Sequence, residues 1–279
     1  MKKICALALM LVLTLACCAY SETMAGILSK ANSSEEEYQV AFSNEDIHNA
    51  LITAEVFSDG VKASDLRVRF YDSFMAMQLA LNRGEVDVIL APAFSGEYML
   101  RNNPEYVLRG VMIGKTPITL SFGFMEEKAD LQRRFNEALA EMNNGALALL
   151  VRDYITLTYK EPPVITFDKF DDAETINVAV TGDLPPIDYI AADGTPAGFN
   201  TALLAEIGRR LHVNINLVNI ETGARMSALK SGRVDAIFWI EVLGAIKDGH
   251  EVHQSDITEG VIYSKPYYGW NQVFLIGKK

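Results

Sequence analysis

Beyond its N-terminus this chain has no cysteine and no long hydrophobic run. Its cysteines, Cys5, Cys17 and Cys18, all lie near the start of the chain, so the rest of it has no disulfide and no thiol chemistry. No later stretch is apolar over enough residues to span a bilayer. The formal net charge of −11 argues against nucleic acid as a partner.

Sequence motifs of common enzymes are also absent. The chain has no G-x-S-x-G motif, no phosphate-binding P-loop and no cysteine nucleophile. His250, Glu251 and His253 lie close together, but they lack the H-E-x-x-H spacing of zinc proteases and fall in a polar, loop-like region. We therefore expect no enzyme, no catalytic residue, no metal site and no cofactor.

The N-terminal segment has the layout of a secretory signal over residues 1–21. Two lysines precede an apolar run over 4–16, and small residues follow. Cleavage after Ser21 is one outcome. The other, which we favour, is a lipoprotein box that ends at Cys17, with Cys17 lipidated. Either outcome predicts secretion across the cytoplasmic membrane, to the periplasm or to a lipid-anchored state at the cell surface. Residues 22–37 are polar and acidic and are expected to form a tether.

One pattern, A-L-x-x-G-x-V-D-x-I, occurs twice, at 80–89 and at 228–237. Each copy predicts the end of a helix, then a glycine in the left-handed cap conformation, then a strand. The strands expected at 86–91 and 234–240 are almost entirely apolar after the aspartate, which is typical of parallel strands covered on both faces. The sequence therefore predicts an α/β protein with two similar lobes.

Apolar periodicity and capping residues predict the other elements. Strands are expected at 38–42, 66–71, 118–125, 176–180 and 213–220, and helices at 45–57, 74–82, 95–101, 130–142 and 146–154. Asn200 is expected to cap one more helix, and Asp193-Gly194 to form a hairpin tip. The segment 159–175, with two prolines and several acidic residues, is the predicted linker. It separates an α/β domain at 38–158 from another at 176–279.

The order of motifs in the second half resembles a known family. The strings I-N-V-A-V-T-G-D-L-P-P-I-D-Y, D-G-T-P-A-G-F-N, A-L-K-S-G-R-V-D-A-I and Y-S-K-P-Y-Y follow one another between 176 and 268. They resemble the first lobe of type II periplasmic solute-binding proteins of the amino-acid-transport class, family 3. Residues 38–155 resemble the second lobe of that family, with a Y-D-S helix, the A-L-x-x-G-x-V-D pattern and terminal helices separated by N-G.

The resemblance implies a two-lobed fold with its lobes in an unusual order. The family runs from lobe one to lobe two and back, whereas here the second-lobe-like half comes first. This order implies either a circularly permuted binding protein, which we favour, or a fragmentary tandem of two proteins. Chain termini that lie close together at the surface make a permutation physically easy.

The family also implies a function and a site. Its members capture a solute in the cleft between the lobes and pass it to the permease of an ABC importer. No nucleic acid is implied, and the membrane is contacted only through a lipid anchor. The alternative is a binding-protein-like module that has lost solute capture and serves as a sensor or interaction domain. Carried over by position, the ligand-binding residues are Ser43, Asn44, Pro92 and Phe94 in the second lobe and Asp183, Tyr189, Trp239, Glu241 and Tyr267 in the first.

Several positions depart from the amino-acid-binding pattern of the family. Ile187 stands where an aromatic residue is usual, and the stretch 239–248 lacks the usual T-x-x-R arginine. Ala91-Pro92 stands where an aspartate usually meets the α-ammonium group. Burying a zwitterion without either counter-charge would cost several kcal/mol. We therefore expect no standard α-amino acid held in the standard way, and the aromatic, weakly acidic residues that remain predict a cationic or aromatic solute.

Overall fold

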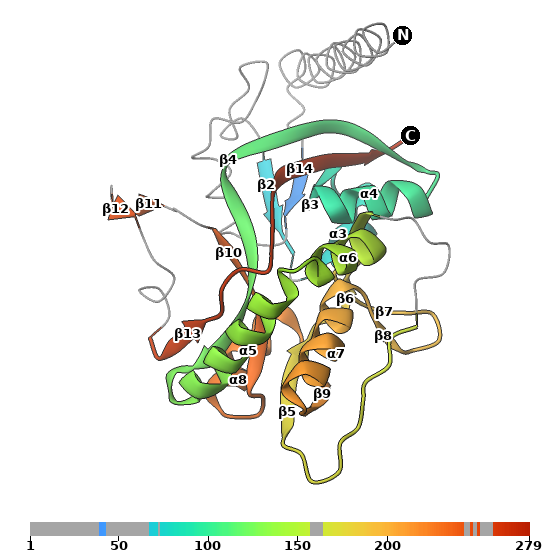
Figure 1. Ribbon diagram of the computed structural model, residues 1–279. Coiled ribbons are helices and arrows are strands. Elements are labelled where there is room, and N and C mark those ends of the chain that lie inside the picture. The colour runs from blue at the N-terminus through green and yellow to red at the C-terminus, as the bar shows by residue number, and fades with distance from the viewer. Residues whose placement is uncertain are drawn as a thin grey trace, which may run out of the picture. The chain divides into compact units, whose positions relative to one another are not determined.

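Helices and strands alternate along most of the chain, which confirms the expected mixed α/β class (Figure 1). The computed structural model describes residues 39–42, 67–71, 73–156, 164–242, 246–247, 250–251 and 259–279. The predicted signal segment with Cys17, the tether, the helix at 45–57 and the site residues Ser43 and Asn44 lie outside the described residues. In the described part of the chain, no helix is both long and apolar enough to span a membrane.

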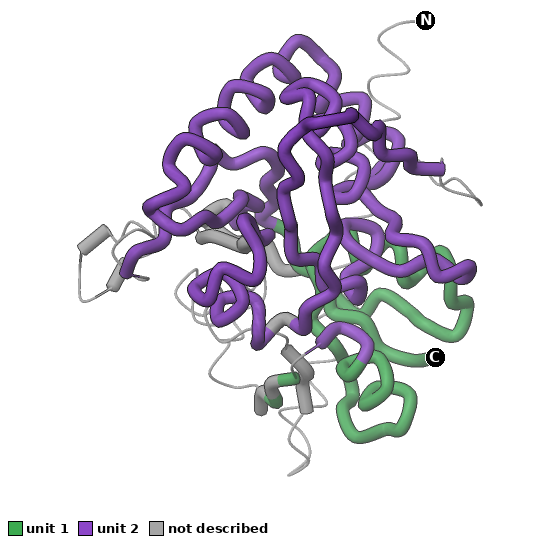
Figure 2. Tube along the Cα trace, turned by 90° about the horizontal axis from the view of Figure 1, so that it is seen from below, with its two compact units in different colours: residues 1–71, 76–115, 272–279 green, residues 72–75, 116–271 purple. Residues whose placement is uncertain are grey.

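The chain divides into two compact units (Figure 2). Unit 1 takes in residues 1–71, 76–115 and 272–279, and unit 2 takes in 72–75 and 116–271. These boundaries differ from the predicted lobes at 38–158 and 176–279. The helices after residue 128 belong to the same unit as the first-lobe-like segment, and the end of the chain belongs to unit 1.

Unit 1 is built around parallel strands with helices between them. Its strands are β1 (Gln39–Phe42), β2 (Arg67–Phe70), β3 (Val88–Pro92), the first part of β4 (Tyr106–Met125) and the end of β14 (Tyr268–Lys278). Its helices are most of α3 (Phe74–Arg83) and α4 (Ala93–Asn102). β1 pairs in parallel with both β2 and β3, and β14 runs antiparallel to β3 with Phe274 opposite Ala91. The first four residues of β3 are buried, as the apolar pattern of 86–91 predicts.

Unit 2 holds a second group of strands in which β5 (Thr175–Val180) lies between β10 (Ala236–Val242) and β9 (Asn214–Asn219), all parallel. The second part of β4 runs antiparallel to β10, and β13 (Val261–Tyr263) pairs with β4. A small antiparallel sheet follows β5. Its strands are β6 (Asp183–Leu184), β7 (Asp188–Ile190) and β8 (Pro196–Ala197). The Asp193-Gly194 turn joins β7 to β8, as predicted.

The helices of unit 2 alternate with its strands along the chain. They are α5 (Ala129–Met142), α6 (Ala146–Val151), α7 (Phe199–Leu211) and α8 (Arg225–Lys230), with short turns of 3-10 helix at Glu126–Lys128 and Thr222–Ala224 and of π-helix at Arg152–Thr156. A two-stranded ribbon, β11 (Ile246–Lys247) with β12 (His250–Glu251), follows β10 in the chain. One apolar core cluster joins β5, α8 and β10 through Ala179, Leu229 and Ile237.

The two copies of the repeated pattern have the same local backbone. Gly84 and Gly232 both have φ of +72°. The glycine N–H donates to a carbonyl three residues back, at Leu81 and Leu229 respectively. In each copy the residue after the glycine donates to the alanine that opens the pattern, Ala80 or Ala228. The prediction of a helix end with a left-handed glycine before a buried strand is confirmed twice.

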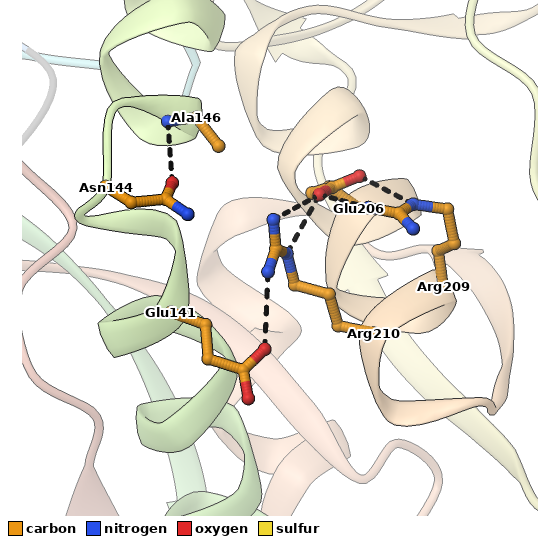
Figure 3. A network of polar contacts seen from close by, with 6 residues as sticks. All are labelled: Glu141, Asn144, Ala146, Glu206, Arg209 and Arg210. Carbon is orange, nitrogen blue, oxygen red and sulfur yellow. Dashed lines mark hydrogen bonds and ion pairs between the residues drawn. The ribbon is translucent and has the colours of Figure 1, made fainter.

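Polar contacts hold α5 against α7 within unit 2 (Figure 3). Arg210 of α7 bonds both to Glu206, at 2.8 Å, and across to Glu141 of α5, at 3.2 Å. Arg134 of α5 pairs with Glu174 at 2.8 Å, just before β5. The inner face of α5 is the predicted one, with Phe135 fully buried. The helices after residue 128 belong to unit 2, and α5 and α6 both contact α7 there.

Candidate functional site

The loop after β5 is held by a buried carboxylate. Asp188 is 5% exposed, and its oxygens accept hydrogen bonds from the Thr181 N–H at 2.8 Å, the Thr181 hydroxyl at 3.0 Å and the Gly182 N–H at 3.3 Å. Burial raises the pKa of Asp188, and the hydrogen bonds from Thr181 oppose that rise. Asp188 thus fixes the turn that carries Asp183 at the carboxyl end of β5, the edge where α/β sheets bind ligands.

The start of α7 closes this turn from the other side. The N–H groups of Phe199 and Asn200 donate to the carbonyls of Pro186 and Ile187 at 3.0 and 2.8 Å. Those bonds satisfy two of the N–H groups that a helix start leaves free. Asn200 is therefore not the N-cap expected from the sequence; that position belongs to Gly198, with φ of +105°. A side chain at Gly198 would meet the Ile187 carbonyl oxygen at 2.6 Å, so the close approach requires glycine.

A guanidinium from the start of α8 lies near this turn. Arg225 Nη1 donates to the carbonyl of Phe238 in β10 at 2.9 Å. Its Nε atom is shielded from solvent and has no hydrogen-bond partner among the described residues, although the residue as a whole is partly exposed. Burial lowers the pKa of Arg225, and the negative charges of Asp188 and Asp183 act against that effect. The guanidinium, the buried carboxylate and the turn therefore form one electrostatic cluster.

Tyr267 lies close enough to Asp188 and Arg225 for their charges to affect its pKa. The residue is 4% exposed and its hydroxyl is 3.2 Å from Asn200 Oδ1, to which it donates. Its ring packs against Phe122 with centroids 4.8 Å apart. Burial raises the pKa of Tyr267 well above its ordinary value, the charge of Asp188 raises it further, and Arg225 lowers it. Tyr267 therefore stays a neutral phenol at physiological pH and serves as a core aromatic with its polar end at the site.

This arrangement suits binding better than covalent chemistry. Asp188 accepts three hydrogen bonds from its own loop, so it is poorly placed to act as a base. Arg225 instead offers donors that no described residue uses. The ring of Tyr268, which is half-buried, lies 5.7 Å from that of Phe199 at the start of α7. No group of three metal-binding side chains occurs among the residues that the structure describes.

The structure brings together some of the residues predicted for the first-lobe wall. Asp183 and Tyr189 are opposite each other in the β6–β7 pair, and both are half-buried. Asp183 lies close enough to Arg225 for its negative charge to raise the pKa of that guanidinium. Trp239 and Glu241 lie on β10, opposite Ser121 and Thr119 of β4, and are described through their backbone alone.

The residues predicted for the second-lobe wall belong to unit 1 where they are described. Pro92 ends β3 and is half-buried, and Phe94 lies in the first turn of α4 with 3% of its surface exposed. Phe94 is buried as a core residue is. Its role as a ligand contact stays a prediction. Their proposed neighbours Ser43 and Asn44 are outside the described residues.

Sequence reasoning did not single out Arg225 or Asp188. The family pattern would place an anion-binding arginine in 239–248, a stretch that runs from the middle of β10 into the segment after it. Arg225 precedes β10 and reaches the same strand from α8 through the Phe238 carbonyl. One signal in the sequence was available. A charged residue stands three positions before the A-L of the second repeat copy, on a short helix whose inner face is otherwise apolar.

This part of unit 2 matches a known protein family. Residues 176–240 match the model of bacterial extracellular solute-binding proteins, family 3. The matched segment includes Asp183, Asp188 and Arg225. No curated protein matches the chain.

Similar solved structures come from several kinds of protein. One is the ligand-binding component of an ABC-type import system from Staphylococcus aureus with zinc bound, at 8% identity and a TM-score of 0.44, covering 88% of this chain and 66% of that chain. Another is an ABC transporter periplasmic binding protein from Brucella ovis with glutathione bound, at 14% identity and 0.42, covering 92% and 65%. A third is CbnR, a LysR family transcriptional regulator, at 10% identity and 0.40, covering 91% and 68%.

The chain spans just under two thirds of the length of both transport proteins. With such identities and TM-scores below 0.5, these similarities assign no solute to this chain. The family match over 176–240 therefore identifies the part of the chain that is similar to solute-binding proteins, and the polar cluster around Arg225 lies within it.

Proposed function

We propose that this chain is an extracytoplasmic solute-binding protein that captures a small polar solute at the Arg225 cluster of unit 2. One observation carries the proposal: a guanidinium whose shielded Nε donor has no partner among the described residues lies beside the carboxyl end of β5, inside the segment that matches family 3. A buried donor without a partner is costly in a folded protein unless something else completes it. A bound solute would complete it.

The proposed role includes further ligand contacts, a partner and a location. By their position in the family pattern, Ser43, Asn44, Pro92 and Phe94 are proposed as further ligand-binding residues. The solute would then pass to the permease of an ABC importer. Signal cleavage would release the protein to the periplasm, whereas lipidation of Cys17 would hold it at the membrane. The description of family 3 as extracellular solute-binding proteins supports both the export and the transport role.

We further propose that the lobes are circularly permuted. The support comes from α5, which precedes the first-lobe-like segment in the chain and bonds to α7 and to Glu174 within unit 2. A rearranged chain with 176–279 placed before 38–158 tests this. It should fold with a cooperative urea transition and the same solute preference as the natural order. Failure to fold in that order, while the natural order folds, would favour the fragmentary tandem.

A thermal-shift screen tests the binding function. The panel holds amino acids, polyamines, amines, aromatic acids and other small organic acids over a wide concentration range. Binding to the native state alone raises the midpoint, with about 2.7 kcal/mol of stabilisation at a concentration one hundred times Kd. We expect one chemical class to raise it in a dose-dependent way. A flat screen would refute solute capture and favour the sensor or interaction module.

A further inference from the structure

The turn between α5 and α6 contains an asparagine followed by a glycine, Asn144-Gly145, a pair that occurs once in the sequence. Asn144 is exposed to solvent. Gly145 has φ of +116°, in the left-handed region that favours glycine. None of these residues belongs to the proposed solute site, so the chemistry of this turn is separate from solute capture.

The side-chain carbonyl of Asn144 points at the first N–H group of α6 (Figure 3). Asn144 Oδ1 accepts a hydrogen bond from the Ala146 N–H at 3.4 Å. No described residue bonds to Asn144 Nδ2. The Gly145 N–H donates to the Met142 carbonyl at 3.3 Å. Both bonds are longer than a typical N–H to oxygen bond, so the turn places these groups close together without locking them.

These groups suit a reaction of the Asn144 side chain with the backbone. The Gly145 nitrogen attacks Asn144 Cγ and gives up its proton to water, and no Cβ on glycine obstructs the attack. The Ala146 N–H donates to Oδ1, where negative charge develops in the tetrahedral intermediate. The intermediate then expels Nδ2, which takes up a proton and leaves as ammonia, and a five-membered succinimide forms. Water opens this ring at either carbonyl to give aspartate or isoaspartate.

We propose that Asn144 is a site of spontaneous deamidation in the folded protein. The reaction consumes only water and releases ammonia, so it needs no enzyme and no cofactor. Each molecule that reacts gains one negative charge at the turn. A molecule that forms isoaspartate also gains one carbon in the backbone between α5 and α6. The modified fraction grows with time and therefore records the age of the protein.

Two nearby asparagines lack this arrangement. Asn136 lies inside α5, and its Oδ1 accepts a hydrogen bond from the Lys265 N–H at 2.7 Å. Asn143 ends α5 with a helical φ of −64° and ψ of −8°. A residue with a side chain follows each of them, and the helical backbone keeps the nitrogen of that residue away from the asparagine Cγ. We expect both to react at least about tenfold more slowly than Asn144.

Mass spectrometry of one tryptic peptide compares the three sites. The peptide 135–152 contains Asn136, Asn143 and Asn144. The intact protein is kept folded in neutral buffer for several weeks, and a sample digested at the start corrects for conversion during digestion. Fragmentation by electron transfer locates the product and distinguishes isoaspartate from aspartate. We expect the mass change from NH2 to OH to accumulate at Asn144, with release of an equal amount of ammonia.

Two variants test the part that the turn plays. Ala146→Pro removes the N–H that faces Asn144 Oδ1, at a first helical position where proline is accepted. It should slow the reaction about tenfold. Asn143→Gln is the matched control and should leave the rate at Asn144 unchanged. Urea unfolding followed by circular dichroism checks that both variants are folded.

The outcomes decide between the site and its mechanism. Conversion at Asn144 that is no faster than at Asn143 would overturn the proposal. Conversion that occurs only in protein unfolded by urea would also overturn it, because the folded turn would then protect Asn144. A wild-type rate in folded Ala146→Pro would show that the Ala146 N–H does not assist, so the mechanism would be wrong while the site stands. None of these results depends on solute binding.

Discussion

Replacing Gly198 with alanine should damage the turn that carries the proposed site. Gly198 has φ of +105° and ψ of 176°, a combination that essentially only glycine adopts. An added Cβ would lie 2.6 Å from the Ile187 carbonyl oxygen and 2.7 Å from that of Pro186. These are the oxygens that accept hydrogen bonds from the first N–H groups of α7. The substitution therefore strains the backbone and also displaces both acceptors.

Backbone strain and lost hydrogen bonds both contribute to the expected loss of stability. The backbone conformation costs about 2 kcal/mol for a residue other than glycine. Loss of two hydrogen bonds adds about 1 kcal/mol each, so Gly198→Ala should lower the free energy of unfolding by about 4 kcal/mol. Urea unfolding followed by circular dichroism measures it. Gly194→Ala is the matched control, because Gly194 has φ of +86° with open space around its Cβ, and it should cost about 1 kcal/mol. Equal losses in the two variants would refute the role assigned to the Gly198 contact.

Two further predictions concern the buried carboxylate and the repeated turn. Because burial raises the folded-state pKa of Asp188, stability should decline as pH rises from about 4 through that raised pKa, by at most about 1.4 kcal/mol per pH unit. Urea unfolding between about pH 4 and pH 7 should show this decline for wild type and its loss in Asp188→Asn, whereas parallel curves would contradict it. Gly84→Ala and Gly232→Ala should each cost about 1 kcal/mol, because both glycines have φ of +72° and open surroundings. Costs that differ by more than about 1 kcal/mol would mean that the two turns are not equivalent.

Local sequence patterns predicted much of the fold because the physics behind them is local. The repeat predicted a glycine cap and a buried strand at 84 and 232, and both have the expected backbone. The periodicity of α5 identified Phe135 and its neighbours as the buried face. The predicted lobe boundaries differ from the compact units because the contacts between α5 and α7 join segments far apart in the chain.

The candidate site was harder to predict because its residues act through burial and distant contacts. Nothing in the local sequence distinguished Asp188, and only the folded chain places three donors around it. Arg225 stood outside the stretch where a family pattern would place an arginine, and its link to β10 runs through a backbone carbonyl that carries no sequence information. Asp183 was predicted from family position, and its negative charge acts on Arg225.

A crystal structure of the protein with the solute that raises its melting temperature most would test solute binding at unit 2 most directly. We predict the solute beside the turn at 181–183, with a polar group within hydrogen-bond distance of the Arg225 guanidinium. A solute bound away from Arg225 and from this turn would contradict the proposed site.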